Sequence, residues 1–323
     1  MMTVDDILKK YEKKRYEAVR KRDKYVEEIK EKFPEIKEIE EKINSCGLEC
    51  TSAIVKNPLR GDEIVAQMEE KIEKLKKERK EILEKFNFSE DYNEIKYSCE
   101  KCSDTGFIGS EKCECFKEQL REYGYERSNI GSLIKKQNFE NFDFSYYSDE
   151  KNKKGISPLD YIKTAYKLSL KFCENFKDAD SILFYGNSGL GKTYLSSCIA
   201  KRLIDDGKNV RYMSASRLFS VYDDYKFNKG DYEENKAVID DAYNCDLLII
   251  DDLGTEFFTS NSLAFMYDLM NERIIKGKKF VISTNLSIKE IEKKYTPRFI
   301  SRINECFVAV KLEGENIRIK IKQ

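Results

Sequence analysis

The sequence predicts an α/β fold, with a parallel β-sheet flanked by helices, preceded by an α-helical arm and a small four-cysteine module. Two observations predict the sheet: a glycine-rich turn joins an apolar run to a helix, and continuous apolar runs recur after it. A third observation predicts the front of the chain, which is rich in Lys and Glu, has widely spaced apolar residues and ends in clustered cysteines.

Composition narrows the functional classes. The 59 Lys and Arg residues balance the 59 Asp and Glu residues of the 323-residue chain, so any contact with nucleic acid should use a local patch. Histidine is absent, which excludes His-based catalysis and leaves cysteines and carboxylates as ligands for a transition metal. Because the chain shows no long apolar run and no signal-peptide pattern, we expect a cytoplasmic protein without a membrane partner.

Residues 1–95 are predicted to form an α-helical partner-binding arm. Apolar residues recur there in thin stripes at helical spacing, and Pro34 suits the first turn of a second helix. Gly47 and residues 52–61 interrupt the pattern before a further helix over residues 62–86. The stripes fit an antiparallel hairpin or a helix docked on a partner, and they also fit a mostly solvated charged arm.

Residues 96–135 are predicted to form a zinc-binding module and a linker helix. Two close cysteine pairs, C-x-x-C and C-x-C, can bring four thiolates to one tetrahedral Zn²⁺: Cys99, Cys102, Cys113 and Cys115. A reducing cell interior favours metal binding over disulfides for such a cluster. Reduced free thiols or a redox pair are the alternatives. Cys46 and Cys50 are interpreted as incidental, although a contribution to a second metal site stays open.

Residues 136–323 are predicted to contain a phosphate-binding loop. Residues 181–193 combine a strand, a glycine-rich turn and a helix start, and they match G-x-x-x-x-G-K-[ST]. Backbone N–H groups and the positive end of the helix would hold the phosphates of ATP. Lys192 would reach the β- and γ-phosphates, and Thr193 would hold Mg²⁺. The loop residues predicted to bind the nucleotide are Gly186, Asn187, Ser188, Gly189, Leu190, Gly191, Lys192 and Thr193. The alternative is an ordinary strand-to-helix turn that contains glycines.

Two later strands end in polar residues. Residues 245–252 form an apolar run that ends in two acids, and residues 279–285 form one that ends at Asn285. The carboxyl ends of parallel strands meet at the ligand-binding edge of such sheets. There Asp251 would orient Mg²⁺ and Asp252 would polarise the attacking water. Asn285 would hydrogen-bond the γ-phosphate or that water; a strand-end cap is its alternative role.

Two arginines follow on a predicted helix. Arg298 and Arg302 are separated by one turn, with no carboxylate expected on the same face. Arginine suits bidentate contact with a γ-phosphate, so we expect one of the two to act there. A salt-bridged surface pair is the alternative.

Basic and aromatic residues that follow the phosphate loop suggest a surface for single-stranded DNA, although several of them must lie in the core. These residues are Arg211, Tyr212, Arg217, Tyr222, Tyr225 and Lys226.

The C-terminal motifs GNSGLGKT, LLIIDDLG, STN, SRI and GENIR occur in the order that AAA+ ATPases of the bacterial replicative helicase loader family, the DnaC/DnaI type, have them. The upstream C-x-x-C-x-D-T-G-F…C-x-C and NFENFD segments also resemble that family, so the resemblance covers residues 99–323. It implies an AAA+ P-loop NTPase core, preceded by the α-helical arm and the zinc module. It also implies that residues 138–142 lie near the adenine.

The same resemblance assigns roles to single residues. It implies that Lys192 and Thr193 are Walker A ligands, Asp251 and Asp252 Walker B acids, Asn285 sensor 1, Arg302 the arginine finger and Arg318 sensor 2. The sequence departs from the pattern of general AAA+ proteins in two respects. The segment after the last predicted strand is short, which predicts a truncated lid and puts the role of Arg318 in doubt. Asp252 stands where many AAA+ proteins carry Glu, and its shorter side chain favours slow hydrolysis and a switch over a motor.

The function implied by the resemblance is ATP-dependent loading of the hexameric replicative DNA helicase onto single-stranded DNA. ATP would bind between subunits of a homo-oligomer, with Arg302 of one subunit reaching the γ-phosphate held by the next. An IstB-like transposition helper ATPase and an adaptor whose ATP site only stabilises the fold are the alternatives. A small-molecule kinase is disfavoured, because no acceptor-binding domain is apparent.

Overall fold

The computed structural model describes residues 4–128, 131, 136–255 and 260–320. Contacts divide the chain into two units, residues 1–116 and 117–323, each with buried clusters of its own. The predicted boundaries after residues 95 and 135 stay predictions. None of the helices within the described ranges is long and apolar enough to cross a membrane.

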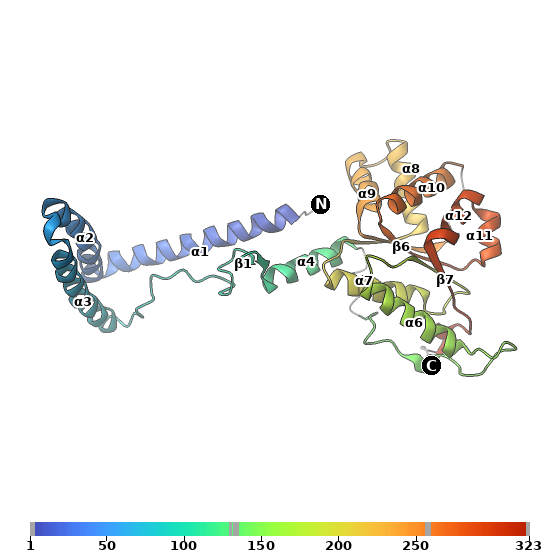
Figure 1. Cartoon of the computed structure of the whole chain (residues 1–323), viewed down its shortest axis with the longest axis horizontal. Helices are drawn as coiled ribbons and strands as arrows, with labels where there is room; N and C mark the ends of the chain where they lie inside the picture. The colour runs from blue at the N-terminus through green and yellow to red at the C-terminus, as the bar shows by residue number, and fades with distance from the viewer. Residues whose placement is uncertain (1–3, 129–130, 132–135, 256–259, 321–323) are drawn as a thin grey trace. The chain divides into compact units, whose positions relative to one another are not determined.

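The N-terminal unit contains three long helices, α1 (Val4–Lys32), α2 (Pro34–Lys56) and α3 (Gly61–Lys85), with the 3₁₀ turn η1 (Pro58–Arg60) before α3. Pro34 occupies the first turn of α2, as predicted. The interruption predicted at Gly47 is wrong, because α2 continues through it, and the interruption predicted over residues 52–61 begins only after Lys56. A glycine within a helix costs only about 1 kcal/mol relative to alanine, and α2 packs against α3 along the hairpin that Figure 1 shows.

The buried core of this unit is small. Where the helices meet the loop after α3, Ile29, Ile36, Leu83 and Tyr92 form one cluster. A second contact lies at the start of α1, where the buried Tyr11 packs on Phe116 at 5.5 Å between ring centroids. Phe116 also packs at 5.2 Å on Phe107 of the β-hairpin formed by β1 (Phe107–Ile108) and β2 (Glu111–Lys112). Much of the remaining helical surface is charged and exposed.

The C-terminal unit is organised around a five-stranded parallel sheet of order β4-β5-β6-β3-β7. Its strands are β3 (Ser181–Tyr185), β4 (Val210–Ser214), β5 (Leu247–Leu253), β6 (Lys279–Thr284) and β7 (Phe307–Lys311). The apolar runs predicted as central strands form β3, β5 and β6, which are adjacent in the sheet. Their carboxyl ends therefore meet at one edge.

Helices cover both faces of this sheet, as Figure 1 shows. One face packs against α6 (Pro158–Glu174) and α7 (Lys192–Asp205), and the other against α8 (Ala215–Lys226), α9 (Tyr232–Asn244), α10 (Ser260–Ile275), α11 (Ile288–Lys294) and α12 (Pro297–Cys306). Alternate strand residues serve the two faces: Ile182 and Phe184 belong to the first core and Leu183 to the second. The shorter elements are α4 (Glu114–Arg127), η2 (Phe144–Tyr146) and α13 (Ile317–Lys320). The linker helix predicted within residues 96–135 includes α4, and residues 129–130 and 132–135 of that prediction lie outside the described ranges.

Candidate nucleotide site and four-cysteine cluster

The phosphate loop connects β3 to α7 and packs tightly against the segment that follows β7. Gly186 and Gly189 adopt left-handed φ angles of +134° and +76°. A Cβ atom on Gly186 would lie 2.1 Å from the carbonyl oxygen of Leu312, and one on Gly189 would lie 1.9 Å from Asn316 Oδ1. Ile317 donates its backbone N–H to the carbonyl of Gly189 at 2.9 Å. These positions therefore require glycine both for conformation and for the close approach of the chain.

Lys192 lies buried at the start of α7, with its ammonium group inside the loop. Its Nζ donates to the carbonyl oxygens of Gly186 and Asn187, both at 2.7 Å, and to Asn285 Oδ1 at 2.8 Å. Burial lowers the pKa of Lys192, while the charges of Asp252 and Asp251 oppose that shift. The loop carbonyls thus hold a desolvated cation that can exchange these partners for phosphate oxygens.

Asp251 lies at the end of β5 and accepts hydrogen bonds from three hydroxyl groups. Thr193 Oγ1 is 3.1 Å from Asp251 Oδ2, Tyr212 donates to the same oxygen at 2.8 Å, and Ser283 donates to Oδ1. A threonine hydroxyl beside a carboxylate offers the oxygen ligands that Mg²⁺ prefers. The pair Thr193–Asp251 therefore fits the predicted magnesium site.

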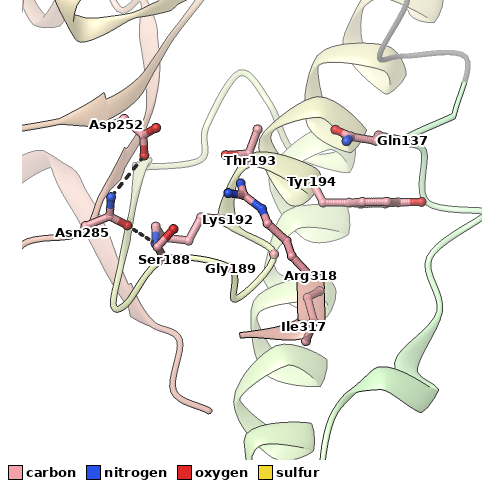
Figure 2. Close-up of a pocket in the computed structure, with 11 residues that line it drawn as sticks. Gln137, Ser188, Gly189, Lys192, Thr193, Tyr194, Asp252, Asn285, Ile317 and Arg318 are labelled. Carbon is pink, nitrogen blue, oxygen red and sulfur yellow. Dashed lines mark hydrogen bonds between the residues drawn. The ribbon is translucent and has the colours of Figure 1, made fainter. Parts of the chain in front are cut away.

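Asp252 and Asn285 form the side of the pocket next to Lys192. Asn285 Nδ2 donates to Asp252 Oδ1 at 3.4 Å, so one amide group connects Lys192 with Asp252 (Figure 2). Burial raises the pKa of Asp252, and the neighbouring charge of Asp251 raises it further. A carboxylate whose proton affinity is increased in this way suits a group that polarises water.

The opposite side of the pocket carries residues from α13 and from the segment before α6. Figure 2 shows Arg318 extending from α13 into the pocket, and Asn316 Oδ1 accepts the backbone N–H of Arg318 at 3.0 Å. The complete lining is Gln137, Ser188, Gly189, Gly191, Lys192, Thr193, Tyr194, Asp252, Asn285, Ile317 and Arg318. The structure thus brings together predicted residues that are far apart in the sequence.

Sequence reasoning missed several of these positions. Gln137 and Tyr194 line the pocket, whereas Asn138 and Phe139, predicted near the adenine, are buried and do not belong to its lining. The Tyr194 hydroxyl donates to the carbonyl oxygen of Asn141 at 3.0 Å, which fixes the turn that carries Gln137. The adjacency of Gln137 to the NFENFD segment was the signal that could have identified it.

The two predicted arginines lie outside the lining of this pocket. Arg298 is exposed, and Arg302 pairs with Glu305 at 2.7 Å. The expectation that this helix face carries no carboxylate is therefore wrong, because Glu305 follows Arg302 at i,i+3 spacing. Within a single chain, Arg302 is therefore paired with Glu305.

The prediction of a surface for single-stranded DNA is wrong for two of its residues. Arg211 and Tyr212 are only 3% and 6% exposed and belong to the interior. Tyr222 stacks on Phe265 with 3.8 Å between ring centroids. Arg217 and Lys226 of α8 are the exposed basic residues of the predicted set.

The four predicted zinc ligands converge in the N-terminal unit. Their sulfur atoms all lie within 4.8 Å of one another, with Cys99–Cys113 at 3.8 Å and Cys102–Cys115 at 3.6 Å. Four thiolates around Zn²⁺ with bonds of about 2.3 Å would be separated by about 3.8 Å, so the cluster fits this ion. Within the described ranges it is the one cluster of potential ligands, and Cys46 lies apart, donating to the carbonyl of Lys42.

Backbone geometry holds the first half of the cluster in place. The buried Asp104 accepts the N–H groups of Ser98 and Cys99 at 2.8 and 2.9 Å, and Ser103 and Asp104 adopt left-handed φ angles. Tyr11 of α1 donates its hydroxyl to Cys115 Sγ at 3.3 Å. The cluster is therefore tied to the first helix of the chain by a contact to one of its own sulfurs.

Comparison with known proteins identifies relatives of the C-terminal unit. The family model for IstB-like ATP binding proteins matches residues 117–323. YdaV of Escherichia coli K12 is 24% identical over 203 residues, which are 60% of this chain and 74% of that protein. The replicative helicase loader DnaC of the same strain is 27% identical over 146 residues, 44% of this chain and 59% of DnaC. DnaC of Buchnera aphidicola is 25% identical over 178 residues, 55% of this chain and 67% of that protein.

Solved structures give partial superpositions. AMPPCP-bound DnaA of Aquifex aeolicus matches with a TM-score of 0.45 and 21% identity over 58% of this chain and 53% of that one. The DnaC helicase loader matches with a TM-score of 0.44 and 19% identity over 56% of this chain and 99% of that one. The family match covers the whole pocket from Gln137 to Arg318. The chain is thus a member of the IstB-like ATP-binding protein family, with an AAA+ fold and a pocket at the carboxyl edge of its sheet.

Proposed function

We propose that this protein is an ATPase that loads a hexameric replicative DNA helicase onto single-stranded DNA, with ATP hydrolysis acting as a switch. The observation that carries the ATPase part is the chain of contacts from Lys192 through Asn285 to Asp252 in the pocket. The likeness to DnaC, a replicative helicase loader, supports the choice of partner. This chain spans 59% of that relative, so the partner is part of the proposal.

The pocket residues perform distinct steps in this proposal. The loop amides and Lys192 bind the β- and γ-phosphates, which releases Asn285 from Lys192. Asn285 Nδ2 can then donate to the γ-phosphate, or Asn285 Oδ1 can accept from the attacking water. Asp252 accepts a hydrogen bond from that water and increases its nucleophilicity. Mg²⁺, held through Thr193 and Asp251, would neutralise charge on the phosphates. Because Asp252 is shorter than Glu, we expect turnover to be slow, as a switch requires.

Arg302 completes the site from a neighbouring copy of the chain. In a single chain its guanidinium is held by Glu305, away from the residues that line the pocket. Assembly into a homo-oligomer would exchange Glu305 for the γ-phosphate of the next subunit, and such a finger can raise turnover by about 10³-fold or more. Arg318 acts within its own subunit, where it already lies in the pocket.

The N-terminal unit supplies the helicase contact in this proposal. Residues 1–95 form the partner-binding arm and residues 96–135 the zinc module with its linker. The long exposed helices offer contact area, and Zn²⁺ bound by the four cysteines would fix the module. The exposed Arg217 and Lys226 of α8 are the residues proposed to contact single-stranded DNA.

The test is a pull-down of a replicative helicase by the full chain, with and without ATP, together with ATP turnover in the presence of single-stranded DNA. Lys192→Ala should weaken nucleotide binding about 100-fold, since it removes charged hydrogen bonds to phosphate. Lys201→Ala is the matched control, because Lys201 lies on the same helix, outside the lining of the pocket, and pairs with Asp205 at 2.7 Å. Helicase loading by Lys192→Ala at the wild-type rate would contradict the switch.

The same experiment distinguishes the helicase loader from a second candidate function. The family model describes IstB-like ATP binding proteins, which favours a transposition helper ATPase as the alternative. Co-purification with a transposase, and none with helicase, would replace the loader proposal. Binding of helicase without any ATP turnover would indicate an adaptor whose nucleotide stabilises the fold.

A further inference from the structure

A β-bulge places the two acids of β5 opposite a single residue of β6. The strands pair regularly up to Ile250 and Ile282, and pairing resumes at Leu253 and Thr284. Asp251 and Asp252 therefore face one residue, Ser283. Such a bulge bends a strand and redirects side chains, and it often occurs beside active sites.

The bulge lets both neighbouring carboxylates serve one site. In a regular strand, successive side chains point to opposite faces of the sheet. Here Asp252 takes a left-handed φ of +56°, which is unusual for a residue other than glycine. As a result Asp251 reaches Thr193, while Asp252 lines the pocket with Lys192. A strained conformation of this kind persists only where the surrounding contacts hold it.

Ser283 supplies those contacts to both acids. Its Oγ accepts the backbone N–H of Asp252 at 3.0 Å and donates to Asp251 Oδ1. A hydroxyl has one proton, so accepting from Asp252 N–H directs that proton to Asp251. Ser283 is completely buried, and water therefore does not compete for either bond.

Tyr212 of β4 fixes Asp251 from the other side. Its hydroxyl donates to Asp251 Oδ2 at 2.8 Å, and the ring is 6% exposed. Thr193 contacts the same oxygen at 3.1 Å, and it is the group expected to turn to the metal. With Mg²⁺ present, Tyr212 and Ser283 would remain as the donors that orient the carboxylate.

We propose that Ser283 and Tyr212 are positioning residues for Mg²⁺-dependent ATP hydrolysis: both orient Asp251 toward the metal, and Ser283 alone also holds Asp252 toward the attacking water. This inference rests on the proposed ATPase function. It assigns the two residues different effects, because Tyr212 contacts one acid and Ser283 contacts both.

The experiment is a Mg²⁺ titration of ATP turnover and of the binding of a fluorescent ATP analogue by the full chain. Tyr212→Phe keeps the ring and should raise the Mg²⁺ concentration for half-maximal binding and turnover about 10-fold, with kcat at saturating Mg²⁺ unchanged. Ser283→Ala should show the same shift and also lower kcat at saturating Mg²⁺ about 10-fold, since Asp252 loses its anchor.

Ser196→Ala is the matched control. Ser196 is a completely buried serine on α7 whose hydroxyl has no hydrogen-bond partner in the described part of the chain, so its removal should change neither quantity. Wild-type Mg²⁺ midpoints in both Tyr212→Phe and Ser283→Ala would overturn the inference, as would an equal shift in Ser196→Ala. If the wild type binds Mg²⁺ and nucleotide without turnover, the ATPase proposal fails, and the binding midpoints still decide whether Asp251 is positioned in this way.

Discussion

The two units of this protein hold their functional groups by different means. In the C-terminal unit, two hydrophobic cores cover the faces of a parallel sheet, and the pocket is lined by the ends of β5 and β6, the phosphate loop, α7 and α13. In the N-terminal unit, the buried apolar clusters are small, and the four thiols lie on a segment whose regular structure is one short hairpin and the start of α4.

This difference decides what each site requires before it can function. Side chains near the ends of packed strands are oriented by hydrogen bonds from neighbouring strands, as the contacts of Asp251 with Tyr212 and Ser283 illustrate. Four thiols gathered on a loop repel one another once ionised, and a metal ion stabilises that arrangement. We therefore expect the nucleotide pocket to persist without ligand and the cysteine cluster to depend on its metal.

The largest expected effect comes from removing that metal. Chelation, or the substitution Cys102→Ser, should unfold residues 97–116 and release the first turns of α1, because Tyr11 then loses Cys115 and Phe116. Zinc contributes on the order of 10 kcal/mol to the folding of small cysteine modules. Hydrogen exchange measured by mass spectrometry should show loss of protection there and unchanged protection in β3 to β7.

Cys306→Ser serves as the control for this prediction. Cys306 is a partly buried cysteine outside the cluster. The zinc content of the Cys306→Ser variant, measured with a colorimetric chelator, should therefore equal that of the wild type. Unchanged protection of residues 97–116 after chelation would show that the hairpin folds without metal and would remove the contrast between the units.

A second prediction addresses a buried charge in the C-terminal unit. Arg273 of α10 is fully buried, and its guanidinium donates to the carbonyl oxygens of Ala242, Cys245 and Lys279 at 2.6 to 2.9 Å. Arg273→Met would leave these acceptors unpaired, at a cost of about 3 kcal/mol in the free energy of unfolding. Thermal unfolding should show this loss in the C-terminal unit, with zinc content unchanged.

The matched variant here is Arg202→Met on α7. Arg202 pairs with Asp206 at 3.4 Å on the surface, and exposed pairs of this kind contribute between about 0 and 1 kcal/mol. Equal destabilisation by the two substitutions would show that burial of the guanidinium does not distinguish Arg273.

The residues that line the pocket could be predicted from the sequence better than the residues that position them. The phosphate loop and the acidic strand end could be assigned because their chemistry requires fixed residue types at fixed spacing, and Lys192, Thr193 and Asp251 indeed lie together. Tyr212 has no such constraint. Its aromatic ring beside a basic residue suggested a DNA surface, yet its hydroxyl points at Asp251, and only the pairing of β4 with β5 reveals this.

The β-bulge opposite Ser283 shows why positioning residues are hard to predict from the sequence. A continuous apolar run predicts a strand, but it does not specify where the register shifts by one residue against its neighbour. Glu305 was missed for a related reason, since the face that Arg302 presents was judged from i+4 spacing and the pair forms at i+3. In the helical arm, the apolar stripes fitted an antiparallel hairpin, a docked helix or a solvated arm, and the structure shows α2 packed against α3. The continuation of α2 through Gly47 could not be predicted, because a single glycine lowers helix stability only slightly.

The smallest predicted effect concerns Glu40, which links the three helices of the N-terminal unit. Its carboxylate pairs with Lys30 at 2.7 Å and Arg79 at 3.5 Å and accepts the Tyr92 hydroxyl. Burial raises the pKa of Glu40, but the hydrogen bonds from Lys30 and Tyr92 lower it more, so its pKa lies below the usual value. A lowered carboxyl pKa contributes stability above the unfolded pKa and loses it as pH falls through the folded value.

Glu40→Gln should therefore lower the free energy of unfolding of the N-terminal unit by about 1 kcal/mol at neutral pH. The difference from the wild type should begin to shrink as pH falls below the ordinary Glu pKa of about 4.3, and it should disappear as pH falls through the lower pKa of the folded state. Glu35→Gln is the control, since Glu35 and Lys85 form an exposed pair at 3.1 Å and the substitution should have little effect. A difference that persists at low pH would mean that Glu40 acts through shape and not through charge. The effect expected at Glu40 is small beside that of removing the metal, because hydrogen bonds to one carboxylate contribute far less than four metal–thiolate bonds.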